Sequence, residues 1–267
     1  MRIGLIELHV DLRRRPASEV RAAIVANPRA RERLVRTALD EAREKRCGVV
    51  LFPGWTLVTH RPHALPSWLR AASAGRTIIC ECIPPRSARP KTGGKVGNDP
   101  MFDGWFHVVR DGTSVLQPVK QVLSEAHHVA RYGSELAREL GRSDARRWRE
   151  GGVRAIFMAC GEVNIVSGGG PSEASWRRTD LSDPTRDGAR LVLNPAHTPS
   201  SPQAMRDKRE FLSRGGGWLM TTANVYTADR SRYRAADAWH DGEAANHLEG
   251  PNELARDRGY AVHVATI

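Results

Sequence analysis

The sequence predicts an α/β protein in which mixed β-sheets are covered by helices. Short apolar segments such as residues 49–52 alternate with segments such as residues 28–45, in which apolar residues recur at helical spacing. The strand and helix patterns return in the second half of the chain, after a strand–turn–strand pattern at residues 105–119. Two such halves that pack sheet against sheet would give a four-layer α-β-β-α sandwich, and residues 1–267 are expected to form a single domain.

The individual elements follow from apolar runs and from the residues that end them. A turn is expected at Asp111-Gly112, between two apolar runs, and Gly215-Gly216-Gly217 should end a helix. Residues 84–100 are rich in Pro, Gly, Lys and Arg, which predicts a loop. In chain order, strands are expected at residues 3–8, 49–52, 77–83, 105–109, 114–119, 153–159, 191–193, 218–225 and 260–266, and helices at 28–45, 67–74, 126–140, 144–150 and 202–214.

The composition excludes some classes of protein and leaves others open. The formal net charge of +11 suggests a nucleic-acid or acidic partner, but the basic residues are scattered and no aromatic residues are interleaved with them. Solvated basic faces are therefore expected, and nucleic acid is not an expected partner. No apolar run approaches the roughly 20 residues of a membrane helix, and the apolar start of the chain is too short for a signal peptide. We expect a cytoplasmic protein without a membrane anchor.

Cysteine usage points to one reactive thiol. Cys47, Cys80 and Cys82 are expected to be buried, reduced thiols, and the four cysteines lack the spacing of a metal site. Cys160 differs because it follows an apolar strand and precedes a glycine, at a strand end where α/β proteins bind ligands. A nucleophilic cysteine needs a nearby base or positive charge, and Lys120, at another strand end, could lower its pKa or stabilise an oxyanion. A packed core thiol is the alternative.

Three segments resemble the nitrilase (carbon–nitrogen hydrolase) superfamily, whose members use a Glu–Lys–Cys triad and no cofactor. Residues 49–53 are similar to the family's first catalytic strand, residues 118–120 to the segment that carries its lysine, and residues 156–162 to its nucleophile turn. Residues 188–196 resemble the segment that lines the pocket opposite the nucleophile. The resemblance covers nearly the whole chain. It implies that Cys160 is the nucleophile, that Lys120 stabilises the oxyanion, and that the protein is a homodimer or larger homo-oligomer.

The sequence departs from the family at the catalytic glutamate. Gly54 stands where the family has that residue, after Phe52-Pro53, and glycine offers no proton acceptor. Glu125 is one candidate replacement, because some family members carry a second glutamate near that position. The other candidates are acidic residues and histidines in or near the expected site: Glu7, Glu81, Glu162, His60, His127, His128 and His197.

Four further residues, with Gly54, are expected at the substrate pocket. Trp55 could form its floor, and Asn194 and His197 follow a strand end that faces it. Glu162 is included because it lies two residues past Cys160, although hydrogen bonds to backbone or lysine groups are its expected contacts.

The sequence therefore predicts an enzyme that acts on a small amide, nitrile or carbamoyl compound through a Cys160 thioester, without a metal or cofactor. A catalytically impaired relative that binds a small molecule or a protein partner is the alternative. A basic nucleic-acid-binding module is a third hypothesis, which no motif supports.

Overall fold

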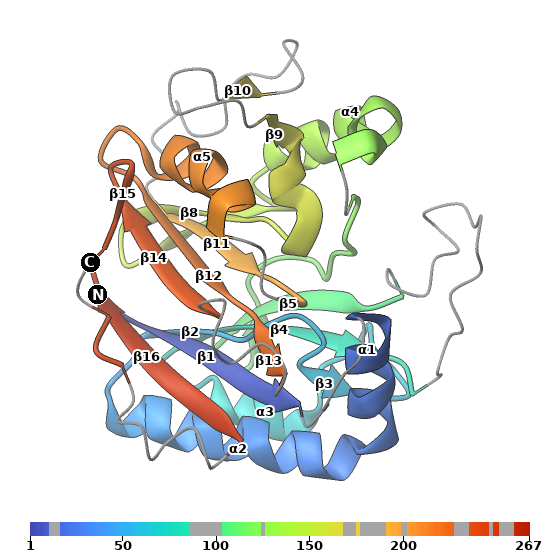
Figure 1. Ribbon diagram of the computed structural model, residues 1–267. Coiled ribbons are helices and arrows are strands. Elements are labelled where there is room, and N and C mark those ends of the chain that lie inside the picture. The colour runs from blue at the N-terminus through green and yellow to red at the C-terminus, as the bar shows by residue number, and fades with distance from the viewer. Residues whose placement is uncertain are drawn as a thin grey trace.

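Two β-sheets lie face to face between two layers of helices (Figure 1). The computed structural model describes residues 1–10, 17–85, 103–123, 126–167, 175–176, 191–198, 202–226, 235–245, 248–250 and 259–267. The predicted four-layer α-β-β-α arrangement is confirmed.

The first sheet is built around parallel apolar strands from the N-terminal half. Its central order is β13-β1-β2-β4-β5-β6, with β16 paired antiparallel to β1 and β3 paired with β4. Strands β1, β2 and β4 are parallel and largely buried, as expected for strands covered on both faces. The strands are β1 (Arg2–Val10), β2 (Val49–Leu51), β3 (Leu57–Val58), β4 (Thr77–Ile83), β5 (Trp105–Arg110), β6 (Thr113–Ser114), β13 (Asn224–Tyr226) and β16 (Tyr260–Thr266).

The second sheet has the order β15-β14-β12-β11-β8-β7, with β8, β11 and β12 parallel at its centre. A separate two-stranded sheet pairs β9 (Val166–Ser167) with β10 (Ser175–Trp176). The strands of the second sheet are β7 (Arg147–Glu150), β8 (Val153–Phe157), β11 (Leu191–Pro195), β12 (Trp218–Thr222), β14 (Ala236–His240) and β15 (Glu243–Ala244).

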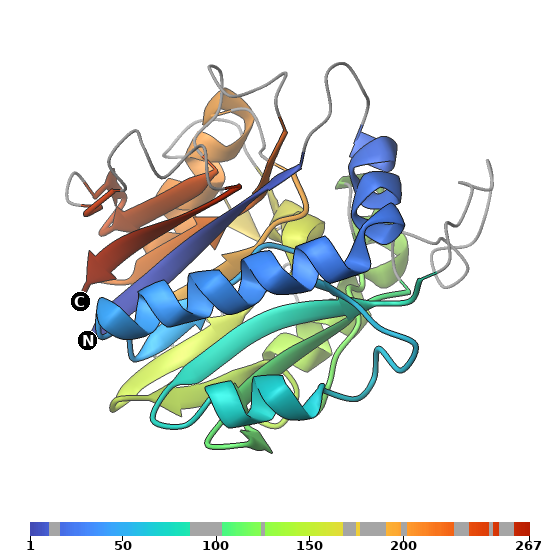
Figure 2. The same ribbon diagram turned by 90° about the horizontal axis from the view of Figure 1, so that it is seen from below.

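Helices cover the outer face of each sheet. Helices α2 (Pro28–Glu44) and α3 (Ser67–Ala72) lie against the first sheet, as Figure 2 shows from below. Helices α4 (Val129–Leu140) and α5 (Pro202–Ser213) pack on the second. Helix α1 (Ala17–Ala26) packs against Trp55 and the end of β4. Two 3₁₀ helices, η3 (Ala126–His128) and η4 (Cys160–Ile165), precede α4 and follow β8.

The apolar core between the sheets carries the contacts that hold the two halves together. Leu5, Leu51 and Phe106 from the first sheet meet Phe157 and Leu193 from the second, and all five are at most 1% exposed. Burying apolar surface on this scale is the main favourable term in folding. The facing sheets therefore fix the relative positions of the strand ends that carry polar residues.

Three sequence predictions are wrong in detail. The helix expected at residues 144–150 is partly strand β7, because Gly151 and Gly152, with φ of 54° and 85°, turn the chain into an antiparallel hairpin with β8. The strand expected at residues 218–225 is divided at Ala223, so that β12 lies in the second sheet and β13 in the first. The hairpin turn at Asp111-Gly112 is confirmed, but β6 is only Thr113–Ser114 and is followed by an isolated bridge at Val119.

Candidate active site

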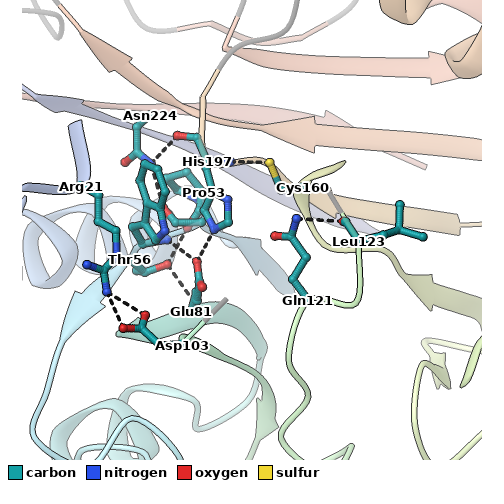
Figure 3. Close-up of polar contacts among 12 residues, drawn as sticks. Arg21, Pro53, Thr56, Glu81, Asp103, Gln121, Leu123, Cys160, His197 and Asn224 are labelled. Carbon is teal, nitrogen blue, oxygen red and sulfur yellow. Dashed lines mark hydrogen bonds and ion pairs between the residues drawn. The ribbon is translucent and has the colours of Figure 1, made fainter. Parts of the chain in front are cut away.

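Residues from four strands meet at one place between the sheets (Figure 3). Gly54 follows β2, Glu81 lies in β4, Cys160 follows β8 and His197 follows β11. Parallel strands bring their carboxyl ends to one edge of a sheet, so the pairing of β2 with β4 and of β8 with β11 gathers these groups.

Cys160 is the most exposed of the four cysteine residues. It is half-buried, whereas Cys47, Cys80 and Cys82 are at most 4% exposed. Its Sγ accepts a hydrogen bond from the backbone N–H of His197 at 3.2 Å. Asn194 donates from Nδ2 to the carbonyl oxygens of Met158 (2.6 Å) and Cys160 (3.1 Å). Asn194 therefore holds the turn that carries Cys160 from the neighbouring strand.

The imidazole of His197 is buried and held on several sides. Its Nε2 lies 2.7 Å from Oε2 of Glu81, and that oxygen also accepts the backbone N–H of Trp55 at 2.5 Å. The indole of Trp55 stacks on the ring, with centroids 4.2 Å apart and an interplanar angle of 15°. A carboxylate and an aromatic face thus orient the imidazole, much as a third group orients the base in other nucleophilic sites.

Two glycines make room for this arrangement. A Cβ on Gly54 would lie 2.1 Å from Cδ2 of His197, and a Cβ on Gly104 would lie 2.0 Å from Oε1 of Glu81. Asp103, beside Gly104, forms a bidentate ion pair with Arg21 of α1, with N–O distances of 2.7 and 2.9 Å. The space beside Gly54 is therefore filled by the His197 imidazole.

Arg31 and Asn224 connect the segments that carry Gly54 and His197. Asn224 donates from Nδ2 to the carbonyl oxygens of Gly54 (2.7 Å) and His197 (2.8 Å). Arg31 donates to Oδ1 of Asn224 and to the carbonyl oxygen of Trp55 (3.0 Å), and its burial lowers its pKa to about 9. Neither residue is among those predicted from the sequence. Arg31 lies four residues before Val35, on the apolar face of its helix, and that unusual placement was the available signal.

The charges at the site favour a thiolate beside an imidazolium. Burial opposes the charged form of His197, but the Glu81 carboxylate and the Cys160 sulfur outweigh it and raise the pKa of His197 to about 10. Burial likewise raises the pKa of the Cys160 thiol. The charge of His197 and hydrogen bonds from it reverse that effect, so the pKa of Cys160 is lowered from its ordinary value. Each of the two shifts therefore favours the charged form of its group.

The other predicted catalytic residues have different surroundings. Lys120 is exposed, and its Nζ lies 5.0 Å from the ring centroid of Trp105, while the next residue, Gln121, is buried. The contact described for its ammonium group is with Trp105, and the role of Lys120 at the oxyanion stays a prediction. Glu125 lies outside the described residues.

The remaining candidate bases do not gather at the site. His60 and His127 are exposed, and the rings of His127 and His128 contact each other. Glu7 binds His263 at 3.0 Å. Across the described part of the chain, no group of three or more His, Cys, Asp or Glu side chains has the arrangement of a metal site.

Glu162 connects the turn that carries Cys160 to the segment that follows β6. It is fully buried and accepts the backbone N–H groups of Val122 and Ala159, each at 2.7 Å. Both of its oxygens also bind the guanidinium of Arg146, at 3.0 and 3.1 Å, and Arg146 is itself fully buried. These contacts give Glu162 a structural function beside Cys160.

We expect an Arg146→Leu substitution to lower the free energy of unfolding by about 3–5 kcal/mol, because it leaves a buried carboxylate without its charged partner. Urea unfolding followed by circular dichroism measures this loss. Arg142→Leu is the control, because the Arg142–Asp144 ion pair is exposed to solvent and its removal should change stability little. Equal losses in the two variants would contradict the assignment.

Comparisons with known proteins show which solved structures share this fold. No protein-family model matches the sequence, and no curated protein matches it either. Two structures of the amidase from Nesterenkonia sp. AN1 match with TM-scores of 0.53 and 0.55 at 13% sequence identity, covering 100% and 99% of this chain and 93% and 90% of theirs. One is described as an amidase from the nitrilase superfamily, and the other carries a Michael adduct of acrylamide at its active-site cysteine.

A second group of similar structures contains larger enzymes. The glutamine-dependent NAD(+) synthetase from Cytophaga hutchinsonii matches with a TM-score of 0.51 and 14% identity, over 99% of this chain and 42% of its own length. Among the described residues, no helix is long and apolar enough to span a membrane. The chain described here has the fold of the nitrilase-superfamily amidases.

Proposed function

We propose that this protein is a carbon–nitrogen hydrolase in which Cys160 is the nucleophile, His197 carries the proton and Glu81 orients His197. The observation that carries the proposal is the position of Cys160, whose Sγ accepts the backbone N–H of His197 and also a hydrogen bond from the His197 side chain, while a buried carboxylate holds the imidazole. Cys160 follows a strand of a fold shared with amidases that have an active-site cysteine. His197 fills the space beside Gly54, where the resemblance would place a glutamate.

In the acylation step, the thiolate of Cys160 attacks the carbonyl carbon of a small amide or carbamoyl compound. A bond forms between sulfur and carbon, and the imidazolium of His197 donates its proton to the departing nitrogen. The carbon–nitrogen bond then breaks, and the amine leaves as a neutral molecule. The products at the site are a Cys160 thioester and a neutral imidazole.

Deacylation uses the same two side chains in reversed roles. The thioester no longer carries the negative charge that helps to raise the pKa of His197, so the neutral imidazole is a suitable base. His197 takes a proton from water, the resulting hydroxide adds to the thioester carbon, and the carbon–sulfur bond breaks. The acid is released, and the thiolate–imidazolium pair is restored.

The test is the mass of the protein after incubation with a panel of small amides. We expect an acyl adduct on Cys160, its loss in Cys160→Ser, and release of ammonia or amine at a rate that depends on Cys160. A thiol reagent should also label Cys160 more than about tenfold faster than the three buried cysteines at neutral pH. Labelling at equal rates would disprove the activated nucleophile.

A catalytically impaired protein that binds a small molecule is the second candidate. The observation that favours it is the exposed side chain of Lys120, which contacts Trp105 instead of Cys160. Fast labelling of Cys160 without an acyl adduct or amine release from any amide would support this candidate over the hydrolase.

A further inference from the structure

Gln121 lies next to the site and carries a buried amide oxygen that has no hydrogen-bond partner among the described residues. Its side chain is 5% exposed, and Nε2 donates a hydrogen bond to the carbonyl oxygen of Leu123 at 2.9 Å. Within the described residues, Oε1 is buried and accepts no hydrogen bond. The orientation of the amide is fixed chemically, because turning it over would bring Oε1 against the carbonyl oxygen of Leu123.

The contacts of the neighbouring residues hold Gln121 against the nucleophile turn. The backbone N–H of Val122 binds Glu162, which also binds the N–H of Ala159, the residue before Cys160. Arg146 binds both Glu162 and the carbonyl oxygen of Lys120. In Figure 3 the Gln121 side chain extends toward Cys160, with its nitrogen on Leu123 and its oxygen turned to the side where Glu81 and His197 lie.

The site otherwise offers mainly donors to a substrate. The backbone N–H of His197 is already bound to Sγ of Cys160, the His197 ring is a donor as an imidazolium, and Oε2 of Glu81 already accepts from two donors. A buried acceptor without a partner is unfavourable, and a ligand that donates an N–H to it relieves that cost. A site of this kind discriminates strongly against analogues that lack the donor.

We propose that Oε1 of Gln121 accepts an N–H of the substrate and selects primary amides and carbamoyl compounds over esters and nitriles, which carry no N–H at the reacting carbon. The inference rests on the proposed function in taking Cys160 as the reacting group. It narrows the substrate class to compounds with an N–H group on the carbon that Cys160 attacks.

Two matched alkylating reagents test the selectivity without requiring turnover. Chloroacetamide carries two N–H groups, and methyl chloroacetate carries none. Each alkylates a thiolate by the same displacement, in which sulfur bonds to the methylene carbon and chloride leaves. We expect the amide-to-ester ratio of alkylation rates at Cys160 to exceed that of free glutathione by at least about tenfold, the value of one hydrogen bond to a buried acceptor. Intact mass and peptide mapping give the rates, with Cys160→Ser as the blank.

Two substitutions of Gln121 separate recognition from structure. Gln121→Met keeps the length but removes the acceptor, and should bring the ratio to that of glutathione. Gln121→Glu keeps an acceptor oxygen and should retain a preference for the amide. Methyl methanethiosulfonate, which has no N–H, should label Cys160 equally in all three proteins if the site is intact.

The outcomes decide between the inference and the proposed function. A wild-type ratio equal to that of glutathione would overturn the inference, and so would an unchanged ratio in Gln121→Met; a water molecule on Oε1 would give these results. The amide-to-ester ratio of the wild-type protein tests the inference even if Gln121→Met does not fold. Amide-selective alkylation without hydrolysis of any amide would support the inference and remove the proposed hydrolysis.

Discussion

Replacing His197 with glutamine is expected to slow the alkylation of Cys160 at pH 6 by about a hundredfold. A thiol with the ordinary pKa of about 8.5 is well under about 1% thiolate at that pH. In this protein the charge of His197 and hydrogen bonds from it lower the pKa of Cys160, so a larger fraction is thiolate at a given pH. Without His197, burial and the Glu81 carboxylate act on the thiol and raise its pKa, which depletes the reactive form.

The pH dependence of alkylation between pH 5 and 9 provides the measurement. The wild-type rate should begin to fall at a lower pH than the rate for His197→Gln, which should rise steeply toward alkaline pH. His240→Gln is a matched control, because His240 also stacks on a tryptophan, Trp218, with ring centroids 4.3 Å apart, but it is exposed and lies in β14. A flat profile in His197→Gln would show that the imidazole does not activate the thiol.

A Gly54→Ala substitution should lower the free energy of unfolding by about 1–3 kcal/mol, in the range of other overpacked sites. The added Cβ would lie 2.1 Å from Cδ2 of His197, a distance that forces the imidazole or the backbone to move. Because Asn224 and Glu81 hold His197 on other sides, the displaced ring should also lose its contact with Cys160. We therefore expect alkylation of Cys160 to slow together with the loss of stability.

A double-mutant cycle identifies the clash as the cause. In a His197→Ala background the added methyl group has space, so Gly54→Ala should change the free energy of unfolding little. The coupling free energy between positions 54 and 197 should then be about 1–3 kcal/mol. Thermal and urea unfolding provide the values. Gly48→Ala is the control, because its Cβ would meet only the carbonyl oxygen of Arg2, at 3.9 Å. Equal effects of Gly54→Ala with and without the His197 side chain would refute the steric explanation.

The clash between a side chain at position 54 and the His197 ring also determines whether a glutamate can be introduced at position 54. A Gly54→Glu substitution alone has no space, because its first side-chain carbon already meets His197. The combination of Gly54→Glu with His197→Gly removes the ring that occupies the space. Residues 54 and 197 are therefore expected to act as a pair.

Local patterns account for the parts of the site that end apolar strands. Cys160, Gly54 and His197 each follow a short apolar run, so their places at one edge of the sheets could be predicted from the sequence. Glu81 and His197 could be named as candidate bases. Their mutual contact could not be predicted, because it joins residues 116 positions apart on different sheets.

Other features depend on tertiary structure that the pattern does not encode. The apolar run at residues 218–225 is continuous in sequence, and nothing in it shows that Ala223 passes from one sheet to the other. Lys120 and Gln121 are adjacent polar residues, and only the packing around Arg146 and Glu162 decides which side chain is buried. Residues 144–150 have a helical pattern, but the turn at Gly151-Gly152 makes part of this segment a strand.

The passage of one strand from the second sheet to the first has a consequence for cooperativity. Asn224 begins β13 directly after Ala223, where the chain passes between the sheets, and it donates hydrogen bonds to the carbonyl groups of both Gly54 and His197. Separation of the two sheets would pull this strand away from one of its partners, so the site and the sheet interface form one cooperative unit. Backbone amides of β13 should then exchange with deuterium as slowly as those of β1, through global opening and not through local fraying.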